Sequence, residues 1–248
     1  MSEKTAVGAG KRSPLWKRLL PLAFLVAVLI AFFATGLNDY ATFDTLKENR
    51  ETLLTFVRDY FVIAILIYVL GYAFLTAASV PVASLVTIAG GFLFGSYLGT
   101  FLTVLAATIG ATVLFLLART AFGEALQERV GPYIRRMEEG FQEDQVNYML
   151  FLRLVPVFPF WVVNLAPAFL GVSTRVFAIT TFIGIIPGTA VFTIVGSGLG
   201  SVFDRGESFS IDSVLTPEIL AALAGLGILA LVPIVVKKLR KRRAASSQ

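Results

Sequence analysis

The sequence predicts an all-α polytopic membrane protein with two internal repeats, each holding a re-entrant hairpin broken by proline and glycine and then a spanning helix. Hydrophobic residues make up 56% of the chain and charged residues only 15%, unlike the composition of a soluble globular domain. Several apolar runs reach the length of about 20 residues that a spanning helix needs. Two further apolar segments contain prolines and match each other in pattern, which indicates the repeats.

The 248 residues include neither cysteine nor histidine. This excludes thiolate nucleophiles, disulfides, zinc-type sites and imidazole acid–base chemistry, and we expect no metal and no cofactor. The net charge of +5 arises from basic residues that flank apolar runs near both ends, at Lys11, Arg12, Lys17, Arg18 and Lys237–Arg243. Such residues mark the cytoplasmic ends of spanning helices. We therefore expect a multi-pass protein of the cell membrane (inner or plasma membrane), with both termini cytoplasmic and no nucleic-acid partner.

We expect residues 1–13 to be a disordered basic tail. Residues 14–58 hold the first apolar run, Leu19–Leu37, and a charged stretch. The run could be a cleaved signal peptide. The run is long for a signal peptide. For cleavage after Ala34, Phe32 would occupy position −3, where signal peptides carry a small residue. We therefore expect a retained spanning helix. The charged stretch up to Asp59 predicts either an amphipathic helix on the membrane surface or a solvated loop.

Residues 59–200 form the expected core. After the second apolar span, Tyr60–Ala78, the sequence Ser79-Val80-Pro81 interrupts the apolar pattern, and Val82–Gly95 is too short to cross a membrane comfortably. We therefore expect a first hairpin at about residues 79–97. Glycines at four-residue spacing on one helical face would let another backbone approach closely: Gly91, Gly95 and Gly99.

A second hairpin is expected at about residues 150–171. This stretch is apolar, yet it contains Arg153, Asn164 and the prolines Pro156, Pro159 and Pro167. Proline removes a backbone donor and disturbs the preceding helical turn, and broken backbone inside a membrane survives only in contact with protein or a watery cavity. A charged side chain at that depth is a candidate for function, so we place the site here.

The remaining chain supplies the last crossings. A span at Val176–Val195 follows the second hairpin, residues 201–236 hold a loop and the last spanning helix, and residues 237–248 are a basic cytoplasmic tail. Five full spans and two re-entrant hairpins would leave the termini on opposite sides. Either one end is exported or one interrupted segment crosses fully, and we favour the second, with six crossings.

The two hairpin segments align with each other. The separation of Pro81 from Pro156 is nearly that of Gly95 from Gly171, and each copy begins with Val-Pro-Val and ends with glycine before a full span. Chance similarity between apolar stretches is the alternative. Corresponding interrupted segments are typical of transporters whose site lies between the repeats. We expect these residues to shape the hairpins and the spans that follow: Pro81, Gly91, Gly95, Gly99, Pro156, Pro159, Gly171, Gly184, Pro187 and Gly188.

Both halves resemble one family. The second half carries Arg153, Pro156, Pro159, Asn164, Gly171, Phe177, Gly184, Pro187, Gly188 and Gly196 in a pattern similar to the VTT domain of the DedA superfamily. This superfamily is also called the SNARE-associated Golgi protein family, and the resemblance is strongest to the branch shared by bacteria and the yeast and animal Golgi membrane proteins. The first half looks like the same family at Val80-Pro81, Gly90–Gly99, Gly110 and Phe115–Arg119.

The resemblance implies two opposed hairpins and movement of a phosphate-bearing lipid, either phospholipid scrambling or translocation of undecaprenyl phosphate. The bacterial DedA branch places acidic residues in and after its first hairpin, whereas Thr76–Gly110 contains neither aspartate nor glutamate. This departure weakens the expectation of proton-driven transport and favours passive scrambling.

Three residues are the candidates for binding substrate. The planar guanidinium of Arg153 matches phosphate oxygens, or it could satisfy carbonyls freed by the prolines. Asn164 could bind a headgroup or cap a half-helix. Arg175 could touch substrate or only snorkel to the membrane–water boundary.

The function that we expect is transport of lipids with phosphate headgroups, and these lipids are the expected partners. The sequence is compatible with either a monomer or a homo-oligomer. We do not expect an enzyme, because the apolar segments contain no serine–lysine or paired-carboxylate arrangement. The alternatives are a membrane-homeostasis or insertion factor without transport activity, and a transporter of a small ion or metabolite.

Overall fold

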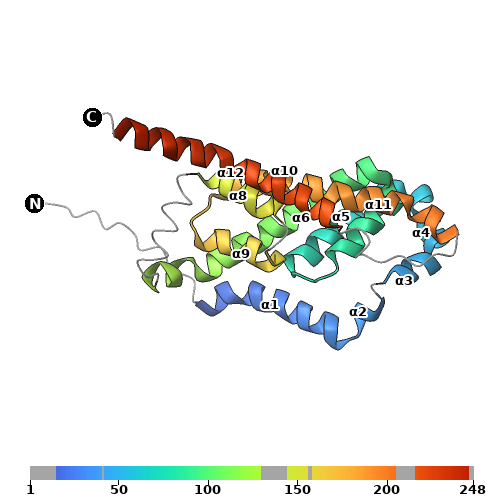
Figure 1. Cartoon of the computed structure of the whole chain (residues 1–248). Helices are drawn as coiled ribbons and strands as arrows, with labels where there is room; N and C mark the ends of the chain where they lie inside the picture. The colour runs from blue at the N-terminus through green and yellow to red at the C-terminus, as the bar shows by residue number, and fades with distance from the viewer. Residues whose placement is uncertain (1–14, 41, 130–143, 156–157, 205–215, 246–248) are drawn as a thin grey trace, which may run out of the picture.

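The computed structural model describes residues 15–40, 42–129, 144–155, 158–204 and 216–245, and in these ranges the protein is helical without strands (Figure 1). The all-α class is therefore confirmed. The helices are α1 (Leu15–Ala34), α2 (Leu37–Tyr40), α3 (Phe43–Glu48), α4 (Arg50–Asp59), α5 (Phe61–Ala77), α6 (Ala83–Arg129), α8 (Gln145–Leu154), α9 (Phe160–Phe169), α10 (Thr174–Gly184), α11 (Ile186–Asp204) and α12 (Pro217–Ala245).

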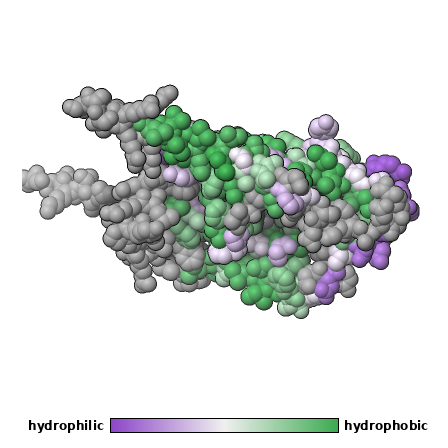
Figure 2. Space-filling view, in the orientation of Figure 1, coloured by the Kyte–Doolittle hydropathy of each residue, from purple (hydrophilic) through white to green (hydrophobic). Residues whose placement is uncertain are grey.

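Within the described ranges, three helical segments are long and apolar enough to cross a membrane: Ala83–Ala121, Thr174–Asp204 and Ile219–Val236. A fourth is obtained if α4 and α5, which are bent by 116° relative to each other, count as one span. The multi-pass membrane class is thus supported, and green hydrophobic residues cover much of the visible described surface (Figure 2). The count of six crossings stays a prediction, since it requires shorter apolar helices such as Leu22–Ala34 to cross as well.

Helix α6 is the centre of the bundle and packs against α1, α5, α9, α10 and α11 (Figure 1). On one side, Leu25 of α1 joins a buried cluster with Ala77, Ala78, Val80 and Leu114. On the other side, α12 packs on α8. The α1 helix therefore covers the start of the first hairpin, and α12 covers the start of the second.

The chain turns back on itself at Gly95. This glycine has φ 78° and ψ 170° and divides α6 into a short helix, residues 83–94, and a long one that begins at residue 96. A Cβ placed on Gly99 would lie 2.7 Å from the carbonyl oxygen of Gly90. Residues nine positions apart in one continuous helix would be about 13–14 Å apart, so the short helix folds back on the long one. Pro81 lies in the turn before the short helix, within the range expected for the first hairpin.

A similar order of elements follows in the second half. Helix α8 ends at Leu154, the short helix α9 follows, and Gly171, with φ 68°, precedes α10. Pro156 lies outside the described residues, and Pro159 is the N-cap of α9. Helix α9 continues through Pro167 and ends within the next turn, and the break between α8 and α9 agrees with our expectation that no straight helix runs through this segment. The structural equivalence of the two halves stays a prediction.

A second break separates α10 from α11. Gly184 is the last residue of α10, and Pro187 is the second residue of α11, where the missing N–H of proline costs little. The charged stretch before Asp59 forms helices α3 and α4, so its helical interpretation holds. An ion pair between Arg50 and Asp204, with 2.6 Å between Nη1 and Oδ1, joins α4 to the end of α11.

We predict that Gly95→Ala lowers the melting temperature of the solubilised protein by several degrees. The φ and ψ of Gly95 lie in a region that only glycine occupies readily, where a side chain costs about 1–3 kcal/mol. No atom lies within 4 Å of a Cβ built on this glycine, so the loss would be one of backbone conformation alone. The control is Gly71→Ala in α5, which also meets no atom within 4 Å. Equal melting temperatures for the two variants would contradict the prediction.

Candidate functional site

The Arg153 guanidinium joins three separate helices. Arg153 lies in the last turn of α8, its Nη1 donates to Oδ1 of Asn164 in α9 at 2.8 Å, and its Nη2 donates to Oγ1 of Thr181 in α10 at 2.8 Å. Arg153 and Asn164 were predicted from the sequence as candidates for binding substrate, but their contact with each other was not predicted. This contact places the last turn of α8 beside the middle of α9.

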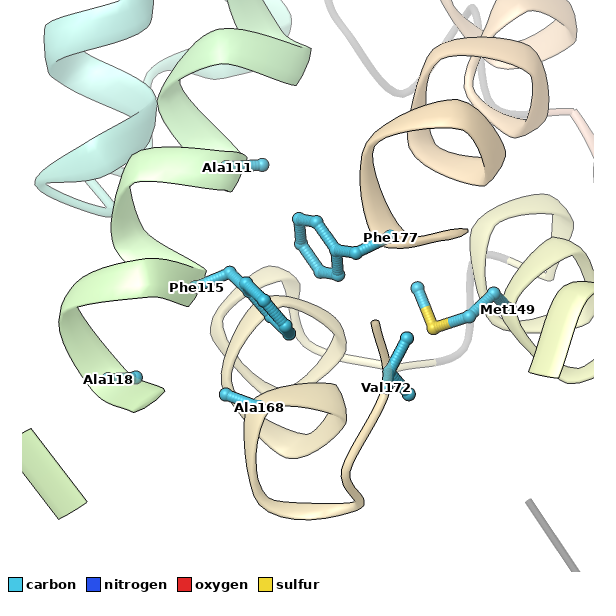
Figure 3. Close-up of a cluster of buried hydrophobic side chains, with 7 residues drawn as sticks. All are labelled: Ala111, Phe115, Ala118, Met149, Ala168, Val172 and Phe177. Atoms are coloured by element: carbon cyan, nitrogen blue, oxygen red, sulfur yellow. The ribbon is translucent and has the colours of Figure 1, made fainter. Parts of the chain in front are cut away.

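Aromatic rings support this guanidinium. The Arg153 Cζ lies 4.9 Å from the centre of the Phe177 ring, a distance at which a cation is attracted by the ring face. The Phe177 ring stacks in turn on Phe115 of α6, with 4.3 Å between ring centres and 23° between ring planes (Figure 3). Both rings belong to a buried hydrophobic cluster that holds them in place. Its members are Ala111, Phe115, Ala118, Met149, Ala168, Val172 and Phe177 (Figure 3).

Gly184 makes room for the arginine side chain. A Cβ at this position would lie 2.7 Å from Cβ of Arg153 and 3.2 Å from its Cγ, closer than carbon atoms pack. We predicted Gly184 as a residue that shapes the chain. The structure places it at the end of α10 and also against the base of the Arg153 side chain.

Two buried donors of this site have no partner. Nε of Arg153 and Nδ2 of Asn164 are buried without a hydrogen bond to any described residue, and Asn164 is 0% exposed. In the described part of the chain, no carboxylate forms an ion pair with Arg153. Because a buried, unpaired polar group costs free energy, this arrangement favours an anion with oxygen acceptors.

Two structural roles were also open from the sequence: Arg153 could satisfy backbone carbonyls, and Asn164 could cap a half-helix. In the ranges that the structure describes, the hydrogen bonds of Arg153 go to side-chain oxygens and none goes to a backbone carbonyl. Asn164 lies inside α9, whose N-cap is Pro159, so it does not cap that helix. Its oxygen instead accepts from the guanidinium.

Thr181 is a member of the site that the sequence analysis missed. Its hydroxyl donates to the carbonyl oxygen of Phe177 at 2.6 Å, which leaves its oxygen free to accept from Arg153. A threonine within an apolar helix usually bonds to its own helix in this way, so the sequence carries no distinct signal for it. Phe177 belonged to the family pattern but was not predicted to contact Arg153.

Other predicted residues lie apart from this group. Arg175 is the second residue of α10 and is exposed, and no hydrogen bond between described residues joins it to Arg153. Gly91 lies against the backbone of Thr193 in α11, whereas a Cβ built on Gly188 would meet no atom within 4 Å. The structure therefore brings together Arg153 and Asn164 and does not bring Arg175 to them.

The first hairpin has its own polar contacts. Tyr68 and Tyr72 of α5 hydrogen-bond through their hydroxyl groups to Thr103 at 2.6 Å and to Thr87 at 2.9 Å. Thr100 bonds to Thr193 of α11 at 2.6 Å. These pairs hold α5 and α11 to α6, and the sequence analysis missed them, since isolated hydroxyl residues in apolar helices give no pattern.

The core that holds both hairpins and the Arg153 group matches a known family. A family model described as the VTT domain matches residues 80–198. This stretch of the chain is a VTT domain. The matched residues run from the start of the first hairpin to α11, and they include Arg153, Asn164 and Thr181, while α1, α5 and α12 lie outside them.

Curated relatives of this chain are named as transmembrane proteins. Transmembrane protein 41B of Xenopus tropicalis is 28% identical over 97% of this chain and 92% of the relative. The human protein of that name is 29% identical over 81% of this chain and 68% of the relative. The Transmembrane protein 41 homolog of Dictyostelium discoideum is 29% identical over 79% of this chain, which spans 58% of that relative's length. No solved structure matches significantly.

Proposed function

We propose that this protein moves lipids with phosphate headgroups between the two leaflets, by passive scrambling or by translocation of an isoprenyl phosphate. The observation that carries the proposal is the Arg153 guanidinium, whose Nε is buried and which has no carboxylate partner among the described residues. It lies beside a second unpaired donor, Nδ2 of Asn164. The VTT domain and the similarity to curated transmembrane proteins support the part of the proposal that places the protein in a membrane.

A phosphate headgroup suits these donors. A guanidinium presents several N–H groups in one plane, and phosphate oxygens accept from two of them at once. Crossing the hydrocarbon is costly for a charged headgroup because it loses its hydration. A positive charge with unused donors would offset part of that cost. Thr76–Gly110 contains no acidic residue, so we propose exchange that runs without a proton gradient.

The decisive experiment compares lipids that differ only at the headgroup. Purified protein is placed in liposomes with fluorescent-tailed lipids that carry a zwitterionic phosphate headgroup, an anionic phosphate headgroup or a sugar without phosphate. We expect the two phosphate lipids to change leaflet faster than the sugar lipid. Equal acceleration of all three would contradict recognition of phosphate. No acceleration of any lipid would leave a non-transporting factor or a transporter of small solutes.

We further propose that the protein lies in the cell membrane with both termini in the cytoplasm. Lysine and arginine flank the apolar segments near both ends, and the start of α1 and the end of α12 lie at the same end of the molecule (Figure 1). Reporter domains fused before Met1 and after Gln248 should therefore both give cytoplasmic signals. An extracytoplasmic signal from either fusion would contradict this orientation.

A further inference from the structure

A groove of about 540 Å³ lies between α1, the α3–α4 pair and the first hairpin. Its apolar lining comes from Phe32 of α1, Leu53 of α4, Leu75 of α5, and Val82, Leu85 and Leu93 at the first hairpin. None of Arg153, Asn164 and Thr181 lines it. The groove is thus separate from the candidate site, and its volume falls in the range of about 300–1,000 Å³ that is typical of pockets for small ligands.

Apart from Tyr68 of α5, whose hydroxyl bonds to Thr103, the polar side chains of the groove come from one side only. Thr42, Thr45, Asn49 and Thr52 all belong to the segment that holds α3 and α4. Hydrophilic residues also gather at the end of the molecule where these helices lie (Figures 1 and 2). Helix α4 is bent by 116° from α5, as expected of an amphipathic helix along the membrane surface beside a spanning helix. The groove therefore passes from a polar end to an apolar end.

The helices beside the groove indicate what fills its apolar part. On α5, Leu66, Ile67 and Leu70 are 54%, 59% and 68% exposed, and exposed apolar faces on a membrane helix contact lipid hydrocarbon. Tyr68 and Leu75 of the same helix line the groove, so the helix that forms this wall is surrounded by acyl chains rather than by water. Thr42, Thr45, Asn49 and Thr52 are uncharged, so they suit the ester region of a glycerolipid better than its phosphate.

We propose that this groove binds one acyl chain of a membrane glycerolipid, with the ester region beside the polar residues of α3 and α4. The bound lipid would lie against the short helix of the first hairpin and would hold α1 and α4 beside it. This site does not depend on the proposed transport function, because it shares no lining residue with the Arg153 group.

The test is photolabelling in detergent, where most of the surrounding lipid has been removed. The purified protein is incubated with a small molar excess of phosphatidylcholine whose acyl chain carries a photoactivatable group, irradiated, digested and analysed by mass spectrometry. We expect labelling to concentrate in residues 68–93, which hold the apolar lining of α5 and the short helix. Labels spread evenly over all exposed apolar faces of the wild-type protein would overturn the proposal.

Variants sharpen this test. Ala89 lines the groove, so Ala89→Trp should fill it and reduce the labelling severalfold. Ala222 is exposed on α12, and Ala222→Trp is the matched control that should leave labelling unchanged. Arg153→Ala should also keep wild-type labelling, which separates failure of the groove from failure of transport. Unchanged labelling in folded Ala89→Trp would overturn the proposal. Labelling that falls as the protein concentration is raised would also overturn it, because a second copy of the chain would then occupy the groove.

Discussion

Replacing Arg153 with lysine is expected to lower the rate of lipid transport per folded molecule about tenfold, since one charge-assisted hydrogen bond is worth about 1.5–3 kcal/mol. Lysine keeps the charge but loses the planar fork that donates to Asn164 and Thr181. Arg153→Ala should lose nearly all transport. The measurement is the rate in liposomes divided by the amount of monodisperse protein. The matched control is Arg58→Lys, at an exposed arginine of α4.

Asn164→Asp separates an anion site from a structural contact. Oδ1 of Asn164 already accepts from Nη1 of Arg153 at 2.8 Å, so a carboxylate at this position would pair with the guanidinium and cancel its charge. If Arg153 serves only to hold α8, α9 and α10 together, the variant should fold and work as well as the wild type. If Arg153 binds phosphate, the folded yield should persist while transport falls. Unchanged transport by Asn164→Asp, together with reduced folded yield of Arg153→Ala, would assign Arg153 to structure.

Part of this architecture was predictable because it depends on backbone properties of single residue types. The turn near Pro81 and the positive φ values of Gly95 and Gly171 follow from residues whose conformational preferences are strong. Arg153 and Asn164 were also predictable, since polar side chains are conspicuous in an apolar segment. The continuation of α9 through Pro167 was not, because tertiary packing can retain a helical turn after proline.

The rest of the site depends on contacts between distant segments. Thr181 and Phe177 come to Arg153 from α10, and nothing local in the sequence distinguishes them from other threonines and phenylalanines in apolar helices. The close approach of Gly184 to the Arg153 side chain has the same origin. The groove beside α1 also requires the bend between α4 and α5. The sequence did not predict this bend, because hydropathy gives the length of a helix but not its direction.

Gly196→Ala is expected to destabilise the contact at which the first hairpin meets α11. A Cβ on Gly196 would overlap the carbonyl oxygen of Ile88 and lie 2.9 Å from its carbonyl carbon. A Cβ on Gly91, in the same contact, would overlap the carbonyl oxygen of Thr193. Both obstructions are backbone atoms, so a change of side-chain rotamer cannot relieve them, and such overpacking costs about 1–3 kcal/mol.

This loss is measurable as a fall in melting temperature of about 2–12 °C for either variant, Gly196→Ala or Gly91→Ala, since 1 kcal/mol corresponds to about 2–4 °C at this chain length. Gly198→Ala is the matched control, because Gly198 lies on the same helix and its Cβ would meet no atom within 4 Å. Alanine there should keep or raise the melting temperature, since glycine inside a helix costs about 0.5–1 kcal/mol relative to alanine. Opposite signs for two alanines placed two residues apart would locate the close backbone contact on one face of α11. Equal shifts for Gly196→Ala and Gly198→Ala would show that the first hairpin does not press on α11 through this glycine.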